Sequence, residues 1–233
     1  MLKKLIKQFF VRRLGVPNQT SSLSLLQKQG FTPKTVFDVG AYKGDFAELA
    51  KSIWPETEVH CFEPLKEKAI DIGNRFKTVG KVHVHNVLLG EEDDKTVVFN
   101  KAETASSVLV EHETNDFEKE EKTMVSLDTL INESNLPHPD FLKLDTQGYE
   151  YQILSGAETS LQNIEVILAE LNHIDIHQNV ILAEEVISLL FSKGFVIFDI
   201  AEMHRRPLDQ ALWQTDFIFV KKNSSLRNSK SWS

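Results

Sequence analysis

The chain has 233 residues, with 26 Lys and Arg against 34 Asp and Glu, 41% hydrophobic residues and one cysteine. This length fits one large domain that buries a core without cross-links, and a single thiol excludes an internal disulfide, so we expect a reducing, cytoplasmic setting. The apolar runs are too short to span a bilayer. The net charge of −8 argues against a nucleic-acid partner, because phosphate contacts need clustered cations.

The charge is divided unevenly along the chain. Residues 1–30 carry six cations and no acidic residue, so the remainder carries a net charge of −14. Residues 1–14 have apolar positions three and four apart, which predicts a basic amphipathic helix. Its apolar face could dock on its own domain, or it could make peripheral contact with an anionic membrane. We expect a helix and linker over 1–30, the main domain over 31–222 and a polar tail over 223–233.

The main domain alternates between β-rich apolar runs and segments of helical spacing. Strands are expected at 35–39, 58–62, 82–89, 141–144, 164–171, 195–200 and 217–220, and helices at 45–53, 65–76, 128–133, 151–161 and 183–193. Short runs at 96–99, 107–110 and 123–127 indicate extra strands or a hairpin. This alternation predicts an α/β fold with a mainly parallel sheet and helices on both faces. Ligands of such sheets bind beyond the carboxyl ends of the strands.

The first expected strand ends in a turn that suits a ligand. Asp38 lies at the strand end, Gly40 follows where a backbone can approach a ligand closely, and Gly44 opens a helix. The turn lacks the glycine triad of a dinucleotide site, because Tyr42 occupies the second position, and it lacks the lysine of a nucleotide P-loop. A tight turn without any ligand is an equal alternative.

The second expected strand ends at Glu63 and Pro64. A carboxylate at this position can accept hydrogen bonds from both hydroxyls of a ribose, and Glu63 follows Asp38 by 25 residues, close to the usual spacing of about 20. The alternative is a surface glutamate before a helix, with Pro64 as its first residue. Together with the preceding turn, Glu63 favours an adenosine-containing cofactor without identifying which one.

Short motifs then occur in a specific order. They are Asp38-Val-Gly-Ala, Phe62-Glu-Pro, Ser106-Ser, Ser126-Leu-Asp-Thr-Leu, Phe141-Leu-Lys-Leu-Asp-Thr-Gln-Gly-Tyr-Glu and Leu154-Ser-Gly-Ala. In this order the chain resembles the FkbM-type methyltransferases, which are class I S-adenosylmethionine-dependent enzymes, from about residue 35 to 220. The resemblance implies a Rossmann-like class I methyltransferase fold, with a mainly parallel seven-stranded sheet whose last strand is antiparallel. The short runs near 96–127 add an expected β-hairpin insertion.

The resemblance also implies a cofactor, an activity and roles for residues. The cofactor would be S-adenosyl-L-methionine, and the activity methylation of a hydroxyl on a sugar, glycolipid or natural product. The cofactor-binding residues would be Asp38, Gly40, Tyr42, Gly44, Glu63, Pro64, Leu88 and Asp145. Asp38 and Asp145 would face the amino-acid end, Glu63 the ribose, and Pro64 and Leu88 the adenine. The family often has a glutamate where Gln147 stands and an asparagine where Tyr42 stands.

Methyl transfer to a neutral hydroxyl needs a base or a metal. Candidates after the fourth and fifth strands are Asp145, Glu150, Glu170 and His173, and His173 is attractive because imidazole titrates near neutral pH. An ordinary loop histidine is the competing interpretation. Glu170, His173, Asp175 and His177 are metal-ligand types, but their spacing matches no zinc pattern. Mg²⁺ would suit oxygen ligands better, and we do not favour a metal.

Other interpretations and features remain. An NAD(P)-dependent oxidoreductase on a related fold, or a non-catalytic binding protein, would share much of this pattern. His83 and His85 alternate along a strand and would share one face, which we interpret as structural. Trp213, with Arg205 and Arg206 before it, could hold a sugar or an anionic acceptor, and ordinary surface packing is an equal alternative. The sequence specifies neither the acceptor nor the oligomeric state.

Overall fold

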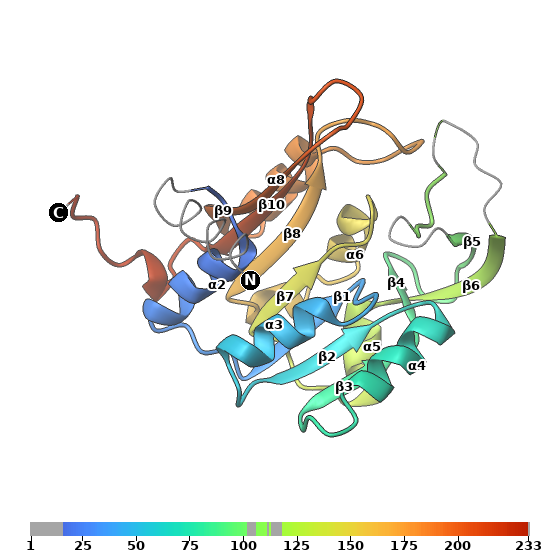
Figure 1. The fold of residues 1–233 in the computed structure, drawn as a ribbon, viewed down its shortest axis with the longest axis horizontal. Helices are drawn as coiled ribbons and strands as arrows, with labels where there is room; N and C mark the ends of the chain where they lie inside the picture. Colours follow the sequence, from blue (N-terminus) through green and yellow to red (C-terminus); the bar gives the residue numbers. More distant parts are fainter. Residues whose placement is uncertain (1–15, 102–105, 111, 113–117, 233) are drawn as a thin grey trace, which may run out of the picture.

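A seven-stranded sheet with the order β3-β2-β1-β7-β8-β10-β9 forms the centre of the protein, beside a three-stranded sheet β4-β6-β5 (Figure 1). This computed structural model describes residues 16–101, 106–110, 112 and 118–232. The strands are β1 (Thr35–Val39), β2 (Glu58–Phe62), β3 (Val82–His85), β4 (Leu88–Gly90), β5 (Thr96–Lys101), β6 (Glu118–Ser126), β7 (Phe141–Leu144), β8 (Val166–Asn172), β9 (Phe195–Arg205) and β10 (Leu212–Lys221). The helices are α2 (Gln19–Lys28), α3 (Asp45–Ile53), α4 (Lys66–Arg75), α5 (Leu127–Ser134), α6 (Glu150–Ser155), α7 (Ser160–Asn163), α8 (Ala183–Ser192) and the 3-10 helix η2 (Ser225–Arg227).

The strand directions confirm the predicted fold class. β3, β2, β1, β7 and β8 pair in parallel, whereas β10 is antiparallel to both β8 and β9. β5 and β6 form the expected hairpin insertion. The strand order reverses between β1 and β7, so the carboxyl ends of these two strands border the crevice where ligands of such sheets bind.

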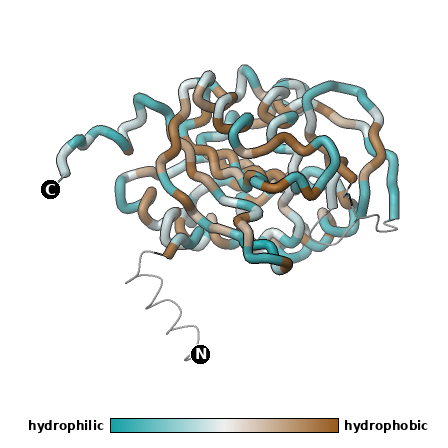
Figure 2. Tube along the Cα trace, turned by 90° about the horizontal axis from the view of Figure 1, so that it is seen from above, coloured by the Kyte–Doolittle hydropathy of each residue, from teal (hydrophilic) through white to brown (hydrophobic). Residues whose placement is uncertain are grey.

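Helices cover both faces of the large sheet, as predicted. All five residues of β1 are buried, because a parallel strand between two helical layers has no exposed face. On one face, Val36 packs with residues of α2, α3 and α4, and on the other Phe37 packs with residues of α5, α6 and α8. Hydrophobic segments accordingly run through the middle of the molecule (Figure 2). These two layers hold the carboxyl ends of the strands in fixed positions.

The predicted strand 82–89 is wrong as a single element. β3 ends at His85, and the chain bends so that Leu88–Gly90 joins the smaller sheet as β4. Asn86 explains the bend, since its amide Nδ2 donates to the backbone oxygens of Glu63 and Pro64, both at 2.9 Å. This bend carries Leu88 to the ends of the central strands.

Two other predicted elements also differ from the structure. The helix predicted over 151–161 is divided into α6 and α7 near Gly156, where a Cβ atom would lie 2.3 Å from the backbone oxygen of Gly90. The strand predicted over 107–110 is reduced to a single bridge between Asn100 and Ser107. In both cases close contact with another part of the chain decides the local structure.

Helix α2 was not predicted, because the sequence indicates a linker after the helix expected over 1–14. Asn18 caps its first turn, and Leu23 and Leu26 are fully buried against the sheet. The Ser22 hydroxyl donates to Asp199 of β9 at 2.7 Å. Helix α2 therefore packs as part of the folded body. The predicted amphipathic helix over 1–14 lies outside the described residues, and none of the described helices has the length and apolarity to cross a bilayer.

Candidate active site

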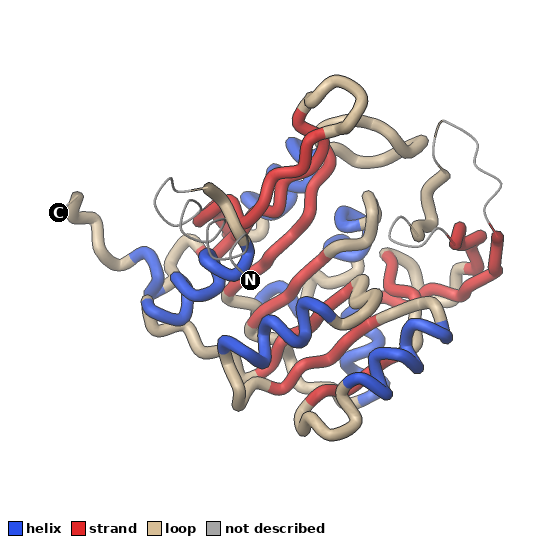
Figure 3. The backbone as a smooth tube through the Cα atoms, in the orientation of Figure 1, coloured by secondary structure: helices blue, strands red, loops and turns tan. Residues whose placement is uncertain are grey.

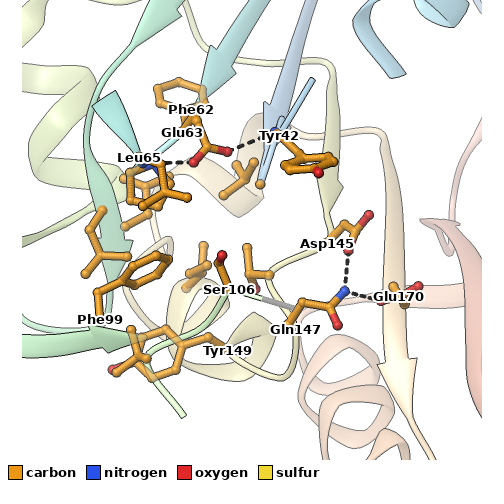
Figure 4. A pocket seen from close by; sticks show the side chains of 18 of the residues that line it. Tyr42, Phe62, Glu63, Leu65, Phe99, Ser106, Asp145, Gln147, Tyr149 and Glu170 are labelled. Atoms are coloured by element: carbon orange, nitrogen blue, oxygen red, sulfur yellow. Dashed lines mark hydrogen bonds between the residues drawn. The ribbon is translucent and has the colours of Figure 1, made fainter. Parts of the chain in front are cut away.

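A cavity of about 460 Å³ lies at the carboxyl ends of the central strands (Figure 4). One part is apolar and includes Pro64, Leu65, Val87, Leu88, Phe99, Tyr149 and Ile153, and the other is polar and includes Asp145, Gln147, Glu170, His204, Trp213 and Gln214. Of the residues predicted from the sequence, Gly40, Tyr42, Glu63, Pro64, Leu88, Asp145 and Glu170 line the cavity, whereas Asp38, Gly44 and His173 do not. Most of the site residues predicted from the sequence thus lie around one cavity.

Glu63 is held at the end of β2 by two backbone amides. Its Oε2 accepts from Tyr42 N and its Oε1 from Leu65 N, both at 2.8 Å (Figure 4). Burial raises the pKa of this carboxyl, and the two backbone hydrogen bonds act in the opposite direction. Each oxygen keeps a further lone pair for a ligand hydroxyl. Helix α4 begins at Lys66, so Pro64 is a cavity residue rather than the first residue of a helix.

The turn after β1 depends on left-handed backbone positions. Gly40 has φ +77°, and a Cβ atom there would lie 1.9 Å from the backbone oxygen of Asp145. Tyr42 is also left-handed, with φ +49°, a conformation that asparagine adopts more readily than most residues and that explains asparagine as the common family residue. Gly44 caps α3 with φ +79° and shapes the turn without lining the cavity.

Asp38, which was predicted to bind the cofactor, does not line the cavity. It is fully buried beneath the cavity, where its Oδ1 lies 3.2 Å from Lys143 Nζ. The same ammonium lies 3.3 Å from Asp145 Oδ2. Burial opposes the charge of Lys143, but the two carboxylates outweigh burial and raise its pKa. Lys143 in turn lowers the pKa of Asp145 against the effect of burial. Asp145 therefore presents a fixed negative charge to the cavity.

The Lys143 side chain was missed in the sequence analysis. The signal was present, because Lys143 is the single charged residue of the otherwise apolar strand β7, between Leu142 and Leu144. A buried lysine needs anionic partners. Its partners come from the ends of two neighbouring parallel strands, which only the fold brings together.

Gln147 connects the two acidic residues of the polar end. Its Nε2 donates to Asp145 Oδ1 at 3.0 Å and to Glu170 Oε1 at 2.9 Å (Figure 4). Gln214 Nε2 donates to the same Glu170 oxygen at 2.9 Å. Burial, followed by repulsion from Asp145 and Asp216, raises the pKa of Glu170 to about 10. Glu170 therefore holds its proton at neutral pH and is unsuited to the role of a base.

His204 is a further titratable residue of the cavity that was not predicted from the sequence. It lies near the end of β9, in the hairpin that β9 forms with β10 (Figure 3). Its Nε2 is 3.6 Å from Oδ1 of the buried Asp216 and 3.7 Å from Glu170 Oε2. The nearby Asp216 carboxylate raises the pKa of His204, and burial opposes this effect. Gln19 Nε2 of α2 donates to the other oxygen of Asp216 at 2.6 Å.

His173 lies outside the cavity. Its Nε2 is 2.8 Å from the Thr215 hydroxyl, and burial lowers its pKa. The suggested ligand group of residues 170–177 is not assembled within the described chain. Instead, Glu170, His204 and Asp216 each place one ligand atom within 4.8 Å of the others, which is close enough for one cation to reach all three.

Trp213 lines the cavity, whereas Arg205 and Arg206, which were grouped with it in the sequence, do not. Arg206 pairs with Asp209 at 2.5 Å, and Arg205 Nη1 donates to the backbone oxygen of Gln210 at 2.9 Å. Both arginines thus stabilise the loop between β9 and β10.

Comparison with known proteins settles the family. The model of the methyltransferase FkbM domain matches residues 38–197, more than half of the chain. The chain belongs to this family. It is a methyltransferase that uses S-adenosylmethionine, and the oxidoreductase alternative is thereby excluded. A comparison with curated proteins gives no match.

Solved structures share the fold at low sequence identity. The N-terminal domain of EvdMO1 in the presence of SAH and D-fucose has a TM-score of 0.51 and 10% identity, over 88% of this chain and 83% of that domain. The longer EvdMO1 structure has a TM-score of 0.52 and 8% sequence identity, over 87% of this chain and 41% of that chain. Precorrin-6y C5,15-methyltransferase from Geobacter metallireducens GS-15 has a TM-score of 0.48 and 11% sequence identity, over 84% of this chain and 85% of that chain.

Proposed function

We propose that this methyltransferase acts on a hydroxyl oxygen of a sugar, glycolipid or natural product. The observation that carries the proposal is the position of His204, backed by Asp216, in the same cavity as Glu63 and Asp145. A neutral hydroxyl must lose its proton as it is methylated, and an imidazole paired with a carboxylate is suited to accept it.

The cavity residues fit S-adenosylmethionine, which supplies the methyl group when bound. Glu63 offers two carboxylate oxygens to a ribose diol, and Pro64 and Leu88 offer apolar surface to an adenine. Asp145 carries the negative charge that suits a sulfonium and an ammonium group. Because Gly40 has no side chain, the end of β1 can lie close against the backbone at the end of β7.

The polar end of the cavity suits an acceptor rich in hydroxyl groups. Gln147 and Gln214 provide amides, the protonated Glu170 can donate or accept, and Trp213 offers an aromatic surface. In our proposal this end orients the acceptor hydroxyl toward the methyl group, and such positioning accounts for a large part of the rate. His204 then takes the hydroxyl proton, and Asp216 stabilises the imidazolium that forms.

A methyl-transfer assay with purified full-length protein tests this function. The panel contains free and lipid-linked sugars, polyketide alcohols, an amine series and transfer RNA, and deoxysugars are included because the EvdMO1 domain was solved with D-fucose. We expect turnover of a hydroxyl acceptor, with the product identified as a methyl ether by mass spectrometry and NMR. Methylation confined to amines or to RNA would refute the proposal.

The same assay tests whether methyl transfer requires a metal ion. Because His204 acts as the base in our proposal, activity should survive treatment with EDTA. Loss of methyl transfer on chelation, restored by Mg²⁺, would instead assign Glu170, His204 and Asp216 to a catalytic cation.

A further inference from the structure

A second group of ligating side chains lies outside the cavity, on β2 and β3. Glu58 and His60 alternate along β2 and so share one face, and the parallel register places His83 of β3 opposite His60. Glu58 Oε1 lies 3.3 Å from His60 Nε2 and 2.9 Å from His83 Nε2. One ligand atom from each residue lies within 4.8 Å of the other two.

His60 is oriented by its neighbours with one nitrogen aimed at this group. Its side chain is buried, and its Nδ1 lies 3.0 Å from His85 Nε2 with the two rings stacked at 10°. Its Nε2 is buried without a hydrogen-bond partner. With Nδ1–H donating to His85, the Nε2 lone pair faces the carboxylate of Glu58 and is available to a cation bound by both groups.

The contact between His60 and His85 also fits a ligating role for His60. A hydrogen bond from the second ring nitrogen to a fixed acceptor is the usual way in which a ligating histidine is held in place.

We infer that Glu58, His60 and His83 bind a zinc ion or a similar divalent transition metal. Two imidazole nitrogens and one carboxylate oxygen form a common zinc ligand set, with water in the fourth position. Ligands in a tetrahedral zinc site lie about 3.4 Å apart, and the two carboxylate–imidazole distances here are 2.9 and 3.3 Å. The nitrogen-rich set argues against Mg²⁺ and Ca²⁺, which prefer oxygen.

The position of the site suggests what the metal does. Among the described strands, β3 is an edge strand of the large sheet and pairs with β2. A metal bound to both strands would cross-link this edge and stabilise the folded state by mass action. The ion can enter from solvent, because the side chains of His83 and Glu58 are 49% and 38% exposed.

The experiment is a zinc titration of the full-length, tag-free protein after chelator treatment and dialysis, followed by calorimetry and thermal unfolding. The test variants are His83→Ala and Glu58→Gln, which change exposed side chains. The control variants are His138→Ala, which removes an exposed histidine elsewhere, and His204→Ala, which removes a histidine of the cavity cluster. We expect zinc, but not Mg²⁺, to raise the melting temperature of the unaltered chain.

The two test variants should weaken zinc binding at least tenfold and abolish the thermal shift, whereas both controls should retain this binding. The inference is overturned if the unaltered chain binds no zinc, or if zinc binding is the same in His83→Ala or is lost in His204→Ala instead. A parallel titration with S-adenosylmethionine separates this site from the proposed function, since His83→Ala should keep full cofactor affinity.

Discussion

The backbone amide of Tyr42 donates to Glu63 Oε2 at 2.8 Å and thereby joins the turn after β1 to the end of β2. The left-handed backbone of Tyr42 occurs at the same turn. Such a conformation costs about 1–3 kcal/mol and persists only where surrounding contacts compensate. A backbone group thus fixes the carboxylate that we assign to the ribose, and the side chain at position 42 can vary.

Replacing Glu63 with glutamine should weaken S-adenosylmethionine binding about tenfold to a hundredfold, which corresponds to about 1.5–3 kcal/mol for hydrogen bonds to a charged group. The new amide would direct N–H groups at the amide of Tyr42 or Leu65. Isothermal titration calorimetry measures the affinity, and circular dichroism checks the fold. Glu67→Gln, an exposed change on α4, is the matched control. Equal affinities in the two variants would contradict the assignment.

Replacing His204 with glutamine should lower kcat by about 10²–10⁴-fold, the range expected for loss of a general base. Cofactor affinity should stay within about twofold, because the change removes the group that we assign to the acceptor proton. The control is His173→Gln, since His173 lies outside the cavity. If His173→Gln loses activity and His204→Gln does not, the base has been assigned to the wrong histidine.

The pH dependence of kcat/KM should show an acidic limb set by His204. A base must be neutral to accept a proton, so activity should rise with pH through the pKa of the imidazole. Because Asp216 raises this pKa, the inflection should lie above 6.5. In Asp216→Asn the inflection should move to lower pH. A limb that stays in place in this variant would show that another group titrates.

Replacing Gly40 with alanine should destabilise the protein by about 2 kcal/mol or more, because the new Cβ meets a backbone oxygen in a left-handed conformation. Gly73→Ala is the matched control, as Gly73 lies in α4 with open space around it. That change should be neutral or stabilising by up to about 1 kcal/mol. Urea unfolding measures both, and similar stabilities would show that the turn tolerates a side chain.

Removing residues 1–14 should release the protein from anionic liposomes if this basic segment contacts membranes. Each cation near an anionic surface contributes about 1 kcal/mol, and five of the six cations of residues 1–30 lie within this segment. Sedimentation with anionic and neutral vesicles measures binding. Full-length protein that ignores anionic vesicles would eliminate membrane contact and leave docking on its own domain.

The fold and about half of the candidate site could be predicted from local sequence patterns. Glu63 and Asp145 come directly after short, largely apolar runs that predict strands, so their place at the sheet edge was predictable. Helix α2 was not, since its Ser- and Gln-rich sequence lacks a strong apolar periodicity and it is stabilised by tertiary contacts, including the packing of Leu23 and Leu26. Tertiary contacts decide such marginal segments.

His204 escaped prediction for a different reason. It acquires its role from Asp216 on the next strand and from Glu170 on β8, and this arrangement depends on the antiparallel register of β10. His173 had a favourable sequence position directly after β8, but its ring pairs with Thr215 outside the cavity. Sequence proximity to a strand end therefore predicted the cavity residues after β1, β2 and β7 better than those of β9 and β10.

The hairpin of β9 and β10 has a consequence for how this enzyme family diversifies. The family match ends at residue 197, before His204, Trp213 and Asp216. The half of the cavity that we assign to the acceptor is thus encoded largely beyond the shared region, while Glu63 and Asp145 lie within it. Evolution could exchange this hairpin to reach a new acceptor and leave methyl-donor binding intact. Family membership alone is consequently a poor guide to substrate, and relatives should be compared by this hairpin.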